Sequence, residues 1–512
     1  MQRNPFAEAN VQRAHQATKH ETYASEDESR GHYGVGMSLI TSSVQFEGAT
    51  VSGVTRADGG VEFRGIRFAR AERFGEPVDE TLAGEITAVD YGPICHQVPG
   101  FLEQTVGLDA SSMSDDCLSL NVYVPKGTTT ESNLPVLFWI HGGAYTNGAG
   151  SLAWYHGSRL ASRGCVVVTI NYRLGIFGFL GTTNLGVKDM VSALRWTNRY
   201  ISGFGGNPNN VTIFGESAGG SAVVSLLATP SAQPLFRKAW AMSPSIGQLR
   251  TKQRGEQIQD IIVAQANVRD LSEVKAKSVD ELLAIQNAVL TRTSNEYDWF
   301  APTDGTDTVS SNLLEVAASS PKPFVIGTNR DENKLWAAFD PRAAEITTEN
   351  WHEHARKVFP NNPDEAVATY EEHRPGETPH FLISAVNTDT AFRARAWSLI
   401  DARVANNVPS WMYWFTWQTP AFGGILGSCH ALDIPFAFDN LDAPGGEMLT
   451  GDSPERLALS ARFADEIAHF ATHDHPTWSQ YDGVSRNTLQ LDVDVTLVSD
   501  PESPIRRLFT AQ

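Results

Sequence analysis

VTIFGESAGGSAVVSLLA, residues 211–228, joins a short apolar run typical of a strand to small and apolar residues typical of a helix. Ser217 stands at the turn between them, with Gly215 and Gly219 on either side. A strand that turns directly into a helix leaves no room for side chains beside the apex, so glycine is needed at both positions. The pattern predicts a nucleophile elbow, which holds the Ser217 hydroxyl at a helix N-terminus, where backbone N–H groups stabilise developing negative charge.

Apolar runs on both sides of the elbow predict the sheet that contains it. Near-continuous apolar strands that alternate with helical segments are typical of a mostly parallel sheet covered by helices on both faces. From Val44 onward, β-like segments with glycine turns predict an antiparallel edge. The expected fold class is therefore α/β, in one domain over residues 43–512. The expected strands are 134–140, 165–172, 238–243, 323–329 and 411–417, and the expected helical regions are 187–205 and about 254–290.

A serine nucleophile needs a base to take its proton and an acid to orient that base. Enzymes with an elbow of this kind carry the three groups in the order serine, acid, histidine. Two later segments fit this order: Asp331 and Glu332 follow the strand at 323–329, and His430 follows the strand at 411–417. From the residues alone, either carboxylate could orient His430.

The oxyanion hole of such a site is expected to combine backbone N–H groups from two places, the residue after the nucleophile and a glycine-rich loop after an early strand. Ala218 follows Ser217, and the sequence His-Gly-Gly-Ala at 141–144 follows the strand at 134–140. The predicted donors are therefore Gly143, Ala144 and Ala218.

Composition excludes several classes of partner. The net charge of −19 argues against nucleic acid and anionic membrane surfaces, and no stretch approaches the length needed to span a bilayer. Residues 1–42 are polar and lack periodicity, so we expect a poorly ordered extension. The start, MQRNPFAEANVQRAHQ, lacks the apolar run of a secretory signal, which favours a cytoplasmic location.

The cysteines, in contrast to the N-terminal sequence, are compatible with a location outside the cytoplasm. Cys165 lies in an apolar run and is expected to be a buried thiol, whereas Cys95 and Cys117 lie in loop-like sequence and could form a disulfide. Such a bond would indicate an oxidising compartment, so secretion is the alternative location.

No cofactor or metal ion is expected. The sequence has no G-x-G-x-x-G motif after a strand and no phosphate-binding loop of the Walker type. Two histidine pairs, His352 with His354 and His473 with His475, have a spacing that a metal site on a strand could use, but both lie in polar, helical or loop sequence.

Four segments together resemble the type-B carboxylesterase family, and the similarity runs from about Val44 to the C-terminus. They are DDCLSLNVYVP at 115–125, HGGAY at 141–145, NYRLGIFGFL at 171–180 and VTIFGESAGG at 211–220. The resemblance implies the α/β-hydrolase fold, with Ser217 as nucleophile, Glu332 as acid and His430 as base.

The same resemblance implies several supporting features. Glu216 corresponds to the buried acid beside the nucleophile in relatives, so it is expected to support the site. Further implied features are a disulfide between Cys95 and Cys117 and two structural ion pairs, Arg73 with Asp115 and Arg173 with Asp189.

Departures from the family pattern narrow the range of expected substrates. The segment between Cys95 and Cys117 is shorter than the lid of the family's lipases, and Gly107 stands where cholinesterases carry the tryptophan that holds their cationic substrate. Trp336 and Arg250 are candidate substrate-binding residues, the first by alignment with an aromatic of the pocket, the second as a group that could recognise a carboxylate.

The predicted function is therefore hydrolysis of short- to medium-chain or small-molecule esters through an acyl-enzyme. Two alternatives remain open at this point. The same triad could pass the acyl group to another acceptor, as in an acyltransferase or lactone-forming enzyme, and the fold also carries non-catalytic adhesion proteins such as the neuroligins.

Overall fold

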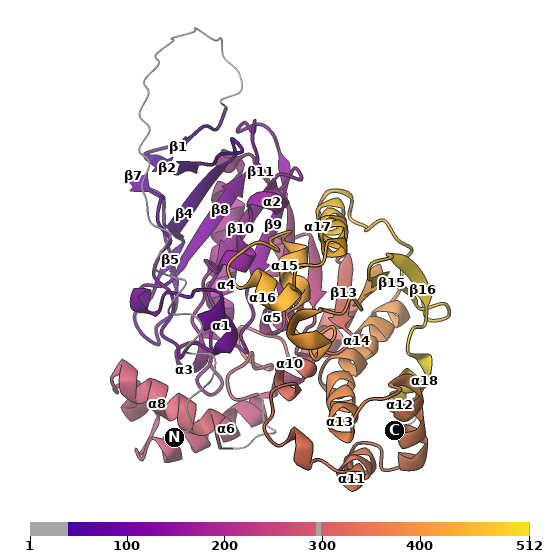
Figure 1. Ribbon diagram of the computed structural model, residues 1–512. Helices are drawn as coiled ribbons and strands as arrows, with labels where there is room; N and C mark the ends of the chain where they lie inside the picture. The colour runs from indigo at the N-terminus through magenta and orange to yellow at the C-terminus, as the bar shows by residue number, and fades with distance from the viewer. Residues whose placement is uncertain (1–38, 293–297, 511–512) are drawn as a thin grey trace, which may run out of the picture. The chain divides into compact units, whose positions relative to one another are not determined.

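The computed structural model describes residues 39–292 and 298–510 (Figure 1), and these residues belong to one compact unit. Most of the predicted N-terminal extension, residues 1–38, lies outside the described residues. Its last part belongs to the fold: Leu39 forms a bridge with Thr129, and the N–H of the buried Ile40 donates to the carbonyl of Thr128 at 2.9 Å. The folded chain therefore begins before residue 43, the predicted boundary.

The described residues form an eleven-stranded central sheet in the order β16-β15-β14-β13-β12-β11-β9-β10-β8-β4-β3 (Figure 1). The seven strands from β15 to β10 run parallel to one another, and β8, β4 and β3 form the predicted antiparallel edge. Strand β16 adds a second antiparallel edge that was not predicted. The strands are β3 (Val54–Thr55), β4 (Val61–Arg67), β8 (Ser119–Val124), β9 (Leu134–Ile140), β10 (Val166–Ile170), β11 (Gly206–Glu216), β12 (Lys238–Met242), β13 (Phe324–Asn329), β14 (Ser410–Phe415), β15 (Asn487–Leu491) and β16 (Thr496–Ser499).

Two smaller sheets are formed by strands near the start of the described chain. One contains β1 (Ser43–Phe46), β2 (Ala49–Ser52) and β7 (Gly84–Thr87), and the other contains β5 (Ala69–Arg70) and β6 (Val78–Asp79).

Helices cover both faces of the central sheet, as predicted. The helices are α1 (Phe101–Thr105), α2 (Ser158–Ala161), α3 (Gly175–Gly178), α4 (Leu185–Tyr200), α5 (Ala218–Leu227), α6 (Lys252–Gln265), α7 (Leu271–Lys275), α8 (Val279–Leu290), α9 (Leu313–Ser319), α10 (Lys334–Ala337), α11 (Thr348–Val358), α12 (Pro363–His373), α13 (Pro379–Thr388), α14 (Ala394–Ala405), α15 (Asp433–Ala437), α16 (Gly446–Thr450), α17 (Glu455–His473) and α18 (Ser503–Thr510). The predicted helical region around 254–290 consists of three of them, α6 to α8.

Alternate residues of β9 show why its sequence is apolar throughout. Phe138 and Ile140 belong to a core that includes residues of α4 and α5, whereas Leu137 and Trp139 belong to a second core that includes residues of α17. Successive side chains of a strand point to opposite faces, so a strand buried on both sides is apolar at most positions.

The elbow is as compact as its glycines predict. A Cβ atom on Gly219 would lie 2.0 Å from the carbonyl oxygen of Ile140, and one on Gly215 would lie 2.6 Å from the backbone of Gly219. The strand β11, the helix α5 and the neighbouring strand β9 therefore meet at van der Waals distance only because these side chains are absent.

We expect Gly219→Ala to lower the free energy of unfolding by about 3 kcal/mol or more, because the new methyl group meets backbone atoms that cannot rotate away. Chemical denaturation measures the effect. Gly483→Ala is the matched control, since its Cβ would meet only a Val404 methyl at 3.8 Å. Equal stabilities of the two variants would contradict the close packing described here.

Candidate active site

Ser217 occupies the apex of the elbow, between β11 and α5. Its backbone has φ 58° and ψ −120°, a left-handed conformation that is unfavourable for a residue with a side chain. The conformation is fixed by hydrogen bonds on both sides: the Ser217 N–H donates to Met242 at 3.0 Å, and its carbonyl accepts from the N–H of Ser221 at 2.9 Å. Strained backbone that the surroundings hold in place is typical of functional positions.

The loop after β9 lies directly against the elbow. A Cβ on Gly142 would come within 3.2 Å of the Ser217 Cβ. Gly143, Ala144 and Tyr145 follow with φ of 102°, 52° and 60°, three consecutive left-handed residues. The part of the chain that the structure describes contains no hydrogen-bond acceptor for the N–H of Gly143 or Ala144.

Ala218 completes the set of three predicted oxyanion donors. It is the first residue of α5, where an N–H has no acceptor within the helix. The structure thus brings the glycine-rich loop and the start of α5 to the same serine.

Glu332 and His430 come together from two different strand ends. Glu332 lies just past β13 and is fully buried; its Oε2 accepts from Nδ1 of His430 at 2.6 Å, and its Oε1 accepts from the N–H of Asn329 at 2.7 Å. The N–H of His430 also donates to the Glu332 carbonyl at 3.1 Å. Because Glu332 occupies Nδ1, the other ring nitrogen, Nε2, is the one left for chemistry.

Nε2 of His430 faces the elbow through Glu216, the residue before Ser217. It lies 3.2 Å from Oε1 of Glu216, and the N–H of Ala431 donates to the same carboxylate. Within the described residues no hydrogen bond joins the Ser217 hydroxyl to His430. Glu216 thus places a carboxylate beside the imidazole, on the side of the nucleophile, where it could play the predicted supporting role.

The two carboxylates determine the charge of the imidazole. Burial lowers the pKa of His430, but the negative charges of Glu216 and Glu332 and the hydrogen bond to Glu332 outweigh it and raise the pKa to about 9. Burial also raises the pKa of Glu216, to about 8.

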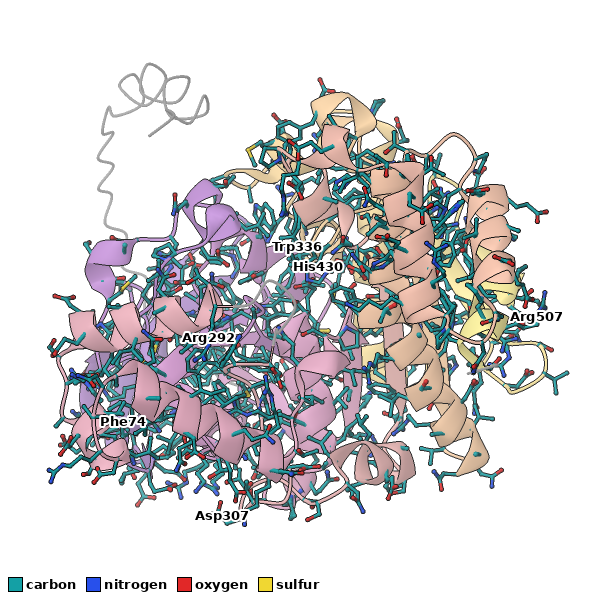
Figure 2. All side chains as sticks on the ribbon, turned by 90° about the horizontal axis from the view of Figure 1, so that it is seen from below. Phe74, Arg292, Asp307, Trp336, His430 and Arg507 are labelled. Atoms are coloured by element: carbon teal, nitrogen blue, oxygen red, sulfur yellow. The ribbon has the colours of Figure 1, made fainter. Side chains whose placement is uncertain are left out.

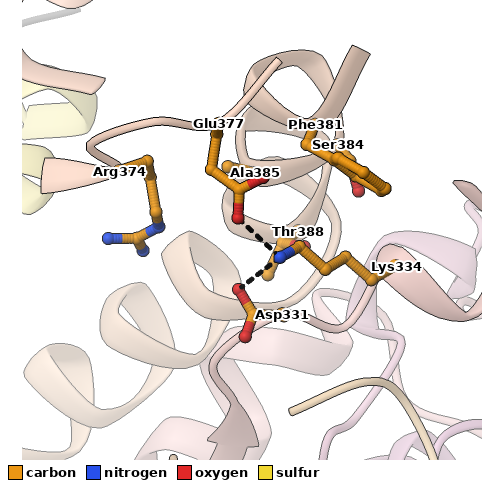
Figure 3. A pocket seen from close by; sticks show the side chains of 8 residues that line it. All are labelled: Asp331, Lys334, Arg374, Glu377, Phe381, Ser384, Ala385 and Thr388. Atoms are coloured by element: carbon orange, nitrogen blue, oxygen red, sulfur yellow. Dashed lines mark hydrogen bonds and ion pairs between the residues drawn. The ribbon is translucent and has the colours of Figure 1, made fainter. Parts of the chain in front are cut away.

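Asp331, the other candidate acid, points away from His430. Its Oδ2 accepts from the N–H of Ser428 at 3.0 Å, and its Oδ1 lies 4.0 Å from Nζ of Lys334, which also binds Glu377 at 2.6 Å (Figure 3). The side chain lines a small pocket between α10 and α13. Of the two neighbouring carboxylates, Glu332 therefore contacts His430, whereas Asp331 connects loops.

Two aromatic rings flank His430. The ring of Trp336, in α10, lies 5.1 Å from that of His430 between centroids, and Figure 2 shows the two side by side. Phe392 lies 4.8 Å away on a π-helical turn, Asp389–Arg393, between α13 and α14. Trp336 is 54% exposed, so its ring is not part of the core, and its role in binding substrate stays a prediction.

Arg250 is wrongly predicted as a carboxylate-binding residue. It is buried, and its guanidinium donates to the hydroxyl of Thr303 at 2.6 Å and to the carbonyls of Trp299 at 2.7 Å and Phe179 at 2.8 Å. Burial lowers its pKa to about 9. The side chain holds two loops together and has no donor directed at a substrate.

One buried acid beside the site was missed. Asp433 lies three residues after His430, at the start of α15, and accepts from Nδ2 of Asn329 and from the Tyr413 hydroxyl, both at 3.3 Å. Burial and the charge of Glu332 raise its pKa to about 7. The sequence signal that could have identified Asp433 is its position close to His430. Its burial could not be predicted from that position, because it depends on contacts with β13 and β14.

The implied ion pairs are present, but the implied disulfide is not shown. Arg73 binds Asp115 at 2.5 Å, and the buried pair Arg173 and Asp189 lies at 2.7 Å. Cys95 and Cys117 are both free, buried thiols; they lie close enough for a hydrogen bond, which together with burial raises the pKa of Cys117. Cys165 is a buried thiol, as predicted.

Comparison with known proteins identifies the family. The family model described as "Carboxylesterase family" matches residues 40–502. The chain belongs to the carboxylesterase family. It is 33% identical to the para-nitrobenzyl esterase of Bacillus subtilis (strain 168) over 504 residues, which cover 93% of this chain and 99% of that protein.

Other relatives and solved structures agree. This carboxylesterase is 31% identical to the phenmedipham hydrolase of Pseudarthrobacter oxydans, over 72% of this chain and 75% of that one. A thermophilic para-nitrobenzyl esterase superposes with a TM-score of 0.78 at 30% identity, covering 92% of this chain and 100% of the other. A carboxylesterase of Geobacillus stearothermophilus gives 0.80 at 28% identity, covering 91% and 100%.

The comparisons confirm the α/β-hydrolase fold and the activity of a carboxylic-ester hydrolase. The non-catalytic alternative is therefore not supported. No helix among the described residues is long and apolar enough to cross a membrane.

Proposed function

We propose that this carboxylesterase hydrolyses small-molecule esters with short or medium acyl chains through an acyl-enzyme on Ser217. The observation that carries the proposal is the 2.6 Å contact between Glu332 and His430, made by residues from separate strand ends at the side of the elbow. An imidazole fixed at Nδ1 by a buried carboxylate, with Nε2 on the side of the nucleophile elbow, is what a serine nucleophile requires.

Each group then has one role. Nε2 of His430 takes the proton of the Ser217 hydroxyl as its oxygen attacks the ester carbonyl, and returns the proton to the leaving alcohol. Glu332 stabilises the imidazolium. The N–H groups of Gly143, Ala144 and Ala218 bind the oxyanion; losing one such donor typically costs about 3 kcal/mol in the transition state. Water, activated by His430, then releases the acid and restores Ser217.

The short segment between Cys95 and Cys117 and the names of the relatives support small substrates. Two of the matched proteins are named para-nitrobenzyl esterase and phenmedipham hydrolase. Labelling with a fluorophosphonate probe, together with hydrolysis of aryl esters of increasing acyl length, tests the proposal. Absence of both would refute it, and a large gain on emulsified triglyceride would refute the substrate range.

The charge of Glu216 gives a testable pH dependence. Its carboxylate stabilises the protonated His430 and so raises the pKa of that residue. Only neutral His430 accepts a proton, so we expect Glu216→Gln to shift the acidic limb of the kcat/KM profile to lower pH, by about one unit or more.

The profile is measured with an aryl ester between pH 5 and 10. Glu349→Gln, at an exposed acid on α11, is the control and should leave the limb in place. A limb that stays fixed or moves upward in Glu216→Gln would show that this carboxylate does not act on the imidazole.

A further inference from the structure

Four large apolar side chains are exposed around the proposed acid and base. Trp336 and Phe339 lie four and seven residues after Glu332, and Phe422 and Ile425 lie eight and five residues before His430. They are 54%, 47%, 39% and 38% exposed. Neighbouring exposed apolar groups of this size are typical of binding surfaces.

Two ring contacts connect these segments to each other and to His430. Phe339, after α10, and Phe422, in the short helix η8 (Ala421–Gly424), form an edge-to-face pair with centroids 5.3 Å apart at 80°. Trp336, three residues before Phe339, lies against the His430 ring, as Figure 2 shows. We call Trp336, Phe339 and Phe422 the aromatic rim.

The backbone under Phe422 is unfavourable. Phe422 has φ 53° and ψ 32°, and Gly423 and Gly424 continue with φ 70° and 82°. A bulky residue is strained in the left-handed region, although a glycine would adopt it freely. The ring is only partly buried, since it remains 39% exposed. Strain of this kind clusters at ligand-binding positions.

The two segments are also fixed to each other. The N–H of Asp331 donates to the Ser428 carbonyl at 2.9 Å, and the N–H of Ser428 donates back to the Asp331 carboxylate at 3.0 Å. The Thr419 hydroxyl donates to Leu449 at 2.6 Å. The aromatic rim is therefore held in place before any ligand arrives, which lowers the entropy cost of binding.

We propose that the aromatic rim binds the alcohol part of the ester and selects aromatic or extended apolar alcohols. This inference rests on the proposed function. His430 must reach the leaving oxygen to return the proton to it, so a wall packed against His430 contacts the alcohol side of the substrate. The rim presents ring faces and edges, which prefer offset or edge-to-face aromatic partners.

The test compares two acetates, 2-naphthyl and methyl, which form the same acetyl-enzyme and differ only in the alcohol. In Phe339→Ala and Phe422→Ala, kcat/KM for the naphthyl ester should fall about two- to ten-fold, with methyl acetate within about twofold. The inhibition constant of 2-naphthol should rise by a similar factor. Phe422→Leu, which keeps apolar bulk without a ring, should lie between the wild type and Phe422→Ala.

Leu497→Ala is the matched control, because this aliphatic is 46% exposed on the edge strand β16. Thermal melting of each variant shows that the fold is kept. If both alanine variants keep the wild-type ratio of kcat/KM for the two acetates and the wild-type inhibition constant of 2-naphthol, the proposed role of the aromatic rim is wrong. The proposed function would still stand. A wild type that hydrolyses neither acetate would instead overturn the proposed function.

Discussion

Replacing Ser217 by alanine is expected to lower kcat on an aryl acetate by about four to six orders of magnitude and to abolish labelling by a fluorophosphonate probe. The effect is large because the hydroxyl oxygen forms the acyl bond itself, and no other group can replace it. The structure supports this expectation through the strained Ser217 backbone and the unpaired N–H groups of Gly143 and Ala144 beside it. Stopped assays at high enzyme concentration measure the residual rate.

Ser225→Ala provides the comparison, since this serine lies two turns further along α5 and its hydroxyl donates to the Ser221 carbonyl at 3.0 Å. It should retain activity within about threefold, because the substitution removes one buried hydrogen bond far from the apex. Substantial turnover by Ser217→Ala, at one-hundredth of the wild-type rate or more, would assign the nucleophile elsewhere.

The sheet and the elbow could be predicted because their signals are local. A strand buried on both faces needs apolar residues at most positions, and β9, β12, β13 and β14 carry such runs. The elbow needs glycine at 215 and 219 because backbone atoms occupy the space of their side chains. Strand β16 lacks this signal, since its residues are half-exposed or exposed.

Contacts between distant segments account for the errors. Arg250 was a candidate because it falls near the acyl-pocket loop of the resembled family and could recognise a carboxylate. Its acceptors, however, belong to loops near residues 180 and 300 that enclose it only in the folded chain. Leu39 and Ile40 follow a polar segment and join the fold through Thr128 and Thr129. Phe392 contacts His430 only because a π-helical turn interrupts the α13–α14 helix pair.

Whether Asp331 or Glu332 contacts His430 also depends on contacts between distant segments. Adjacent residues in a turn point in different directions, and the loop that carries His430 decides which of them meets the imidazole. Glu332 receives Nδ1 of His430, and Asp331 receives the N–H of Ser428 from the same loop. Both carboxylates therefore use one loop, but only one of them contacts the ring.

Glu332→Gln should consequently affect catalysis, whereas Asp331→Asn should affect stability. Glu332→Gln is expected to lower kcat about 10³- to 10⁴-fold, because a neutral amide neither stabilises the imidazolium nor fixes the tautomer in which Nε2 accepts a proton. Asp331→Asn should keep kcat within about threefold but lower the free energy of unfolding by about 1–2 kcal/mol, since its contacts with Ser428 and Lys334 are structural. Steady-state kinetics and chemical denaturation of both variants separate the two effects. A large loss of kcat in Asp331→Asn with activity retained in Glu332→Gln would reverse the assignment, because the hydrogen bond at Nδ1 would then not be the one that orients the base.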